Sequence, residues 1–147
     1  YIAIYEFMGD DVSGFNEALI ELEREGMRAL VIDIRSNPGG LLADVVDIAD
    51  RLLDEGLIVY VEDRSGSRDN YYSDSDHIDI PMAVLVNGNS ASASEILAGA
   101  LQGRAAVYLL LSAVPALAQE AAVTARQRAM LTGQSSFAMT EKPVSVF

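Results

Sequence analysis

The chain has 147 residues, 50% of them hydrophobic, and a formal net charge of −12. That length is enough for one domain with a hydrophobic core, whereas the negative charge argues against binding to nucleic acid or anionic lipid, which needs clustered Lys and Arg. We therefore expect no nucleic-acid partner. With no Cys and a single His, His77, disulfides and thiolate metal sites are excluded, and we predict neither a metal nor a cofactor.

The first third of the chain alternates between strand-like and helix-like segments. Residues 1–7 are rich in β-formers, and residues 12–25 place apolar side chains at helical spacing. The apolar run 29–34 is typical of a buried parallel strand, and it leads through the loop 35–40 into a helical pattern over 41–55. Strand, glycine-rich loop and helix in this order indicate half of a βαβ unit.

The next segments continue this alternation. Residues 57–62 predict a strand, and residues 63–79 predict a polar, solvated excursion with a short β-segment at its two adjacent tyrosines. Residues 81–87 predict a further strand, and residues 91–102 predict a helix. The pattern indicates an α/β layered fold in which a mainly parallel sheet is flanked by helices.

The character of the sequence changes after Arg104. Residues 105–118 are almost entirely apolar but too few to span a bilayer, so we expect no stable membrane insertion. They could form a buried strand, or they could be a signal-like core whose small-x-small end reflects a rearranged C-terminal part; the residues leave both readings open. We therefore divide the chain into residues 1–104 and a divergent segment, 105–147, that we expect to be partly disordered.

Two loops carry the residue types that chemistry needs. Asn-Pro-Gly-Gly (residues 37–40) and Asn-Ser-Ala-Ser-Ala-Ser-Glu (residues 89–95) each follow an apolar strand and precede a helix. In an open α/β sheet such loops share the edge at which ligands bind, and a helix N-terminus offers free N–H groups to a developing oxyanion. The alternative is structural: serines are common helix caps, and glycines are common in tight turns.

These two loops, together with residues 31–36, 84–87 and 96, resemble the core of the C-terminal processing peptidases, also called tail-specific proteases. The resemblance covers about residues 1–104. It implies a serine endopeptidase with a Ser–Lys dyad on a ClpP/crotonase-like fold, a polypeptide substrate cleaved near its C-terminus, and a bacterial cell-envelope or periplasmic location. It also implies an upstream PDZ domain, and the missing initiator Met at Tyr1 agrees with a chain that begins inside a longer protein.

The resemblance assigns roles by position. Ser92 resembles the nucleophile, and the amides of Ala93 and Gly39 resemble the oxyanion hole. The positions that resemble substrate-binding residues are Pro38, Gly40 and Asn89.

The sequence also departs from that family. The general-base lysine is expected roughly two dozen residues after the nucleophile, where Leu117 stands, and the only lysine of the chain is Lys142, which we interpret as a surface residue. The family's Asp is also absent, because Gln102 runs directly into Gly103. His77 receives no catalytic role.

From these departures we expect a serine-peptidase core that is weakly active or inactive. Two other functions remain open: a non-catalytic peptide-binding module that holds an extended peptide by β-augmentation, and a crotonase-like acyl-binding domain. The second gives no role to Ser92.

Overall fold

The molecule is built around one parallel sheet. A computed structural model of the chain describes residues 1–102 and 107–111. The sheet has the order β1-β2-β5-β6, and every neighbouring pair is parallel. Its strands are β1 (Ile2–Ala3), β2 (Leu30–Asp33), β5 (Met82–Val86) and β6 (Val107–Leu111). The predicted α/β fold with a mainly parallel sheet is therefore confirmed.

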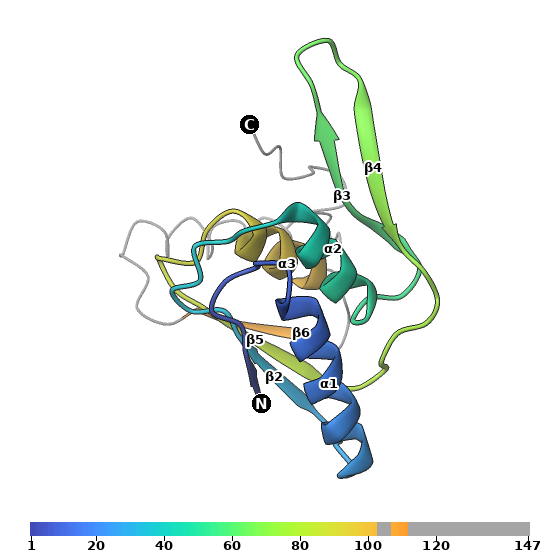
Figure 1. Ribbon diagram of the computed structural model, residues 1–147, viewed down its shortest axis with the longest axis vertical. Coiled ribbons are helices and arrows are strands. Elements are labelled where there is room, and N and C mark those ends of the chain that lie inside the picture. Colours follow the sequence, from blue (N-terminus) through green and yellow to red (C-terminus); the bar gives the residue numbers. More distant parts are fainter. Residues whose placement is uncertain (103–106, 112–147) are drawn as a thin grey trace, which may run out of the picture.

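Three helices form one layer against this sheet. They are α1 (Asp11–Arg24), α2 (Leu42–Asp50) and α3 (Ala93–Gln102). Neighbouring helices pack on each other, and Figure 1 shows them in front of β2, β5 and β6. Alternate strand side chains, such as Ile32 and Val84, are fully buried because successive residues of a strand point to opposite faces.

A long hairpin projects from this body. β3 (Gly56–Glu62) pairs antiparallel with β4 (Arg68–Ser73), and Figure 1 shows the two strands extending well beyond the helices. Near the tip, the Arg68 guanidinium lies 4.3 Å from the centre of the Tyr60 ring and also pairs with Glu62. The predicted β-segment at the adjacent tyrosines is confirmed, but it is longer than expected and belongs to a separate sheet with β3.

Several predicted boundaries were wrong. The first strand covers only Ile2–Ala3, although an isolated parallel bridge joins Phe7 to Gly40, because the chain leaves the sheet to reach the loop after β2. The helix predicted to reach residue 55 ends at Asp50, where the chain tightens into a turn.

The apolar run at 105–118 contains a real strand, which confirms that interpretation for residues 107–111. The remainder of that run, and the segment up to residue 147, lie outside the described residues. Among the helices of the described part, none is long and apolar enough to cross a membrane.

Candidate active site

The two predicted loops meet at the carboxyl ends of β2 and β5. These strands are neighbours in the sheet, so the loops that follow them emerge side by side. The Asn87 side chain joins them: its Oδ1 accepts a hydrogen bond from the Ser36 N–H at 2.9 Å, and its Nδ2 donates to Ser36 Oγ at 3.0 Å. The structure therefore brings together the loops that the sequence singled out.

A second asparagine, Asn37, holds the site together from within. Its side chain is fully buried, and its Nδ2 donates to the Ile4 carbonyl at 2.9 Å, which ties the loop to the end of β1. Its backbone carbonyl accepts from Ala91 N–H and from Ser94 Oγ, both at 3.0 Å. Sequence reasoning gave Asn37 no role of its own, although a polar residue between a buried strand and two glycines is a signal that could have drawn attention to it.

The three serines of the second loop have different environments. Ser90 Oγ donates to the Ile34 carbonyl at 2.7 Å, and Ser94 Oγ is buried against Asn37. Ser92 is exposed, and its hydroxyl has no hydrogen-bond partner among the described residues. Of the three hydroxyls, only that of Ser92 is free to react.

The backbone at Ser92 forms a tight entry into α3. Its φ of 56° lies in the left-handed region, which is costly for a residue with a side chain and concentrates at functional sites. The Ser92 N–H donates to Glu95 Oε2 at 2.8 Å, and the Ser92 carbonyl accepts from the Glu95 N–H at 2.8 Å. The turn therefore caps the helix through its backbone and Glu95, and leaves the Ser92 hydroxyl unused. The N–H of Ala93, the first residue of α3, is accepted by no described residue.

The glycine turn is in close contact with Ser92. Gly39 has a φ of 104°, and a Cβ built on it would lie 2.7 Å from Ser92 Cβ, so only glycine fits there. The Gly39 N–H donates to Asn37 Oδ1 at 2.8 Å, and its carbonyl accepts from the Phe7 N–H at 3.0 Å. Because the C=O and N–H of a trans peptide point in opposite directions, the Gly40 N–H points away from Phe7, and no described residue accepts it.

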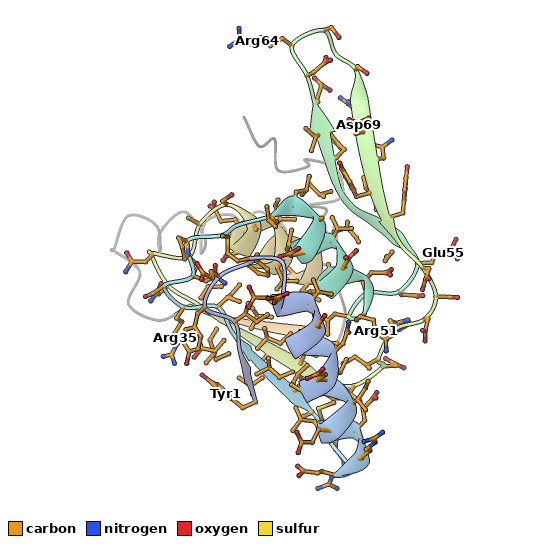
Figure 2. All side chains as sticks on the ribbon, in the orientation of Figure 1. Tyr1, Arg35, Arg51, Glu55, Arg64 and Asp69 are labelled. Carbon is orange, nitrogen blue, oxygen red and sulfur yellow. The ribbon has the colours of Figure 1, made fainter. Side chains whose placement is uncertain are left out.

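An ion pair stabilises the start of the first loop. The Arg35 guanidinium binds both carboxylate oxygens of Asp33, with Nη2 at 2.6 Å from Oδ2, and the Tyr1 hydroxyl donates to Oδ2 at 2.7 Å. Figure 2 shows Tyr1 and Arg35 at the same corner of the molecule. The hydrogen bonds from Arg35 hold the pKa of the Asp33 carboxyl well below its usual range, although partial burial opposes the shift.

Other candidate positions lie at the edge of the site or outside it. Pro38 and Asn89 are exposed on the two loops, and the Asn89 N–H donates to Asn87 Oδ1 at 3.0 Å. His77 lies on a different segment, with its Nδ1 4.0 Å from a carboxylate oxygen of Asp54. Lys142 lies outside the described residues. Within the described residues, no group of three or more His, Cys, Asp or Glu side chains could hold a metal ion.

Comparison with known proteins agrees with this geometry. A family model described as Peptidase family S41 matches residues 1–110. The chain is 42% identical over 104 residues to a chloroplastic C-terminal processing peptidase of Tetradesmus obliquus, covering 69% of this chain and 22% of that protein. It is 43% identical over 103 residues to a carboxyl-terminal-processing protease of Synechocystis sp., covering 69% and 24%. The chain thus spans about a quarter of these relatives.

Among solved structures, the fold is similar to a photosystem II D1 C-terminal processing protease. The TM-score is 0.67 and the sequence identity 39%, over 73% of this chain and 28% of that one.

Proposed function

This chain belongs to peptidase family S41, and we propose that it is a serine-type endopeptidase core that cleaves polypeptides near their C-termini, with Ser92 as the nucleophile. One observation supports this most: Ser92 carries the only unpaired hydroxyl of the three serines, on a strained turn at the N-terminus of a helix. The Oγ atom would attack the scissile carbonyl, and the resulting oxyanion needs two donors beside it.

The Ala93 N–H supplies the first donor, because it opens α3 and is unpaired among the described residues. For the second donor we propose Gly40. The role expected for the Gly39 N–H would require it to leave Asn37 Oδ1, whereas the Gly40 N–H is unpaired among the described residues. In this arrangement Gly39 allows the close approach to Ser92, and Asn37 fixes the turn.

A base must also take the proton from the Ser92 hydroxyl. The sequence has no lysine at the expected position, and among the described residues no side chain contacts that hydroxyl. A positioned base typically contributes about 10²–10⁴-fold in rate, so we expect slow turnover by the chain alone. The upstream PDZ domain and the cell-envelope location remain part of this proposal.

A fluorophosphonate probe, which needs an activated serine, tests the nucleophile. Mass spectrometry of the labelled chain should place the adduct on Ser92, and Ser92→Ala should abolish it. Ser75→Ala changes another exposed serine, and it should label at the wild-type rate. Absence of label on a folded wild-type chain would reject the nucleophile. Peptide binding that survives Ser92→Ala in such a chain would favour the non-catalytic peptide-binding module.

A further inference from the structure

A cavity of about 190 Å³ lies along α3, next to the turn that carries Ser92. Its walls are mostly apolar and include Val86, Ala98 and Gly99. The cavity extends from Glu95 in the first turn of the helix toward the helix C-terminus, a distance of about 10 Å at 1.5 Å per residue. Ser92 therefore lies at one end of an elongated, largely apolar space.

The charge of the cavity lies at that same end. Glu95 is the only charged side chain in its lining, and one of its carboxylate oxygens is 2.8 Å from the Ser92 backbone nitrogen. An apolar body with one anionic end fits a small organic cation that carries an alkyl chain. Cavities of about 150 Å³ hold a benzene molecule, so this one is large enough for an alkylamine of about four carbons.

Such a ligand carries the group that Ser92 lacks. We propose that a small primary alkylamine binds in this cavity, with its alkyl chain on Val86 and Ala98 and its nitrogen at the Glu95 end, and acts as the base for Ser92. This inference rests on the proposed function. The site would make the peptidase core dependent on an external amine.

The proton transfers balance. As Ser92 Oγ bonds to the scissile carbonyl carbon, the neutral amine nitrogen takes the hydroxyl proton and becomes an alkylammonium, while the carbonyl electron pair moves onto oxygen. The alkylammonium then returns the proton to the leaving peptide nitrogen as the C–N bond breaks. In the second half of the reaction the amine takes a proton from the water that hydrolyses the ester and returns it to Ser92 Oγ.

The amine must be neutral to accept a proton. An alkylammonium resembles the lysine side chain, with a pKa of about 10.4, so only a few per cent is neutral at pH 9. The amine-dependent rate should therefore rise with pH up to that pKa. Tetramethylammonium, a cation that cannot accept a proton, should not support the reaction.

The experiment measures fluorophosphonate labelling of Ser92 in the full chain at pH 9 with increasing n-butylamine. We expect a saturable increase of at least about tenfold, which is below the usual contribution of a built-in base. Gly99→Leu fills the cavity, and it should lose this increase while keeping the slow labelling seen without amine. A series from methylamine to hexylamine on the wild type tests the site without any substitution, and the response should peak near the length that fills the cavity.

Several outcomes would overturn the inference. A response that is linear in amine and unchanged by Gly99→Leu, or one that ignores chain length, would show base catalysis from bulk solvent. Labelling of Ser92 with no amine response would reject this site and leave the nucleophile standing. No labelling of Ser92 under any condition would reject both.

Discussion

The most informative single substitution is Asn37→Ala, because this buried side chain links three parts of the molecule. Its removal leaves the Gly39 N–H and the Ile4 carbonyl without their partners, which now lie at 2.8 and 2.9 Å. An unsatisfied buried group costs about 1–3 kcal/mol, so we expect a loss of about 2–4 kcal/mol in the free energy of unfolding. For a domain of this size that corresponds to a fall of roughly 6–12 °C in Tm.

Urea unfolding followed by circular dichroism measures this loss. Asn89→Ala is the matched control: Asn89 lies exposed on the neighbouring loop, and its replacement should change stability by less than about 0.5 kcal/mol. Asn37→Asp keeps an acceptor for the Gly39 N–H but turns an anionic oxygen toward the Ile4 carbonyl, so it should be no more stable than Asn37→Ala. If Asn37→Ala matched the Asn89→Ala control, the central position of Asn37 would be refuted.

Three further substitutions test separate features. Gly39→Ala places a Cβ 2.7 Å from Ser92 Cβ, and it should slow Ser92 labelling at least about tenfold while costing about 1–3 kcal/mol in urea unfolding. Ser94→Ala removes one buried hydrogen bond and should cost about 1 kcal/mol, with the Ser92 adduct still formed. The lowered pKa of Asp33 means that its ion pair with Arg35 stabilises the fold above pH 3.8, its ordinary value, and that this stability is lost as pH falls further. Asp33→Asn should therefore be less stable than wild type at pH 7, and the difference in urea midpoint should shrink below pH 4.

The sequence predicted the order of elements because that order depends on local patterns. The run around Ile32 and the run around Val84 are each apolar without interruption, as strands in a covered parallel sheet are, and both were assigned correctly. The long β4 strand was largely missed because its residues are polar and exposed, and its pairing with β3 supplies the order that its composition does not.

The site divides in the same way. The glycine turn and Ser92 could be found from residue type and position, because each feature is local in sequence. The roles of Asn37 and Asn87 could not be predicted, since both depend on contacts across the sheet: Asn37 reaches Ile4, 33 residues away, and Asn87 reaches Ser36, 51 residues away. Sequence reasoning can identify a polar residue in a loop, but the partner that defines its role comes only from the fold.

Positioning and proton transfer are separate requirements in this molecule, and the structure meets only the first among its described residues. Asn37 fixes the turn, and the free Gly40 and Ala93 amides need no rearrangement to receive charge, which is where most of the benefit of an oxyanion hole arises. Asn37→Ala should therefore slow Ser92 labelling by the same factor with and without added amine. Filling the cavity should remove the amine response alone. Equal losses from both substitutions would mean that the cavity and the turn act as one unit.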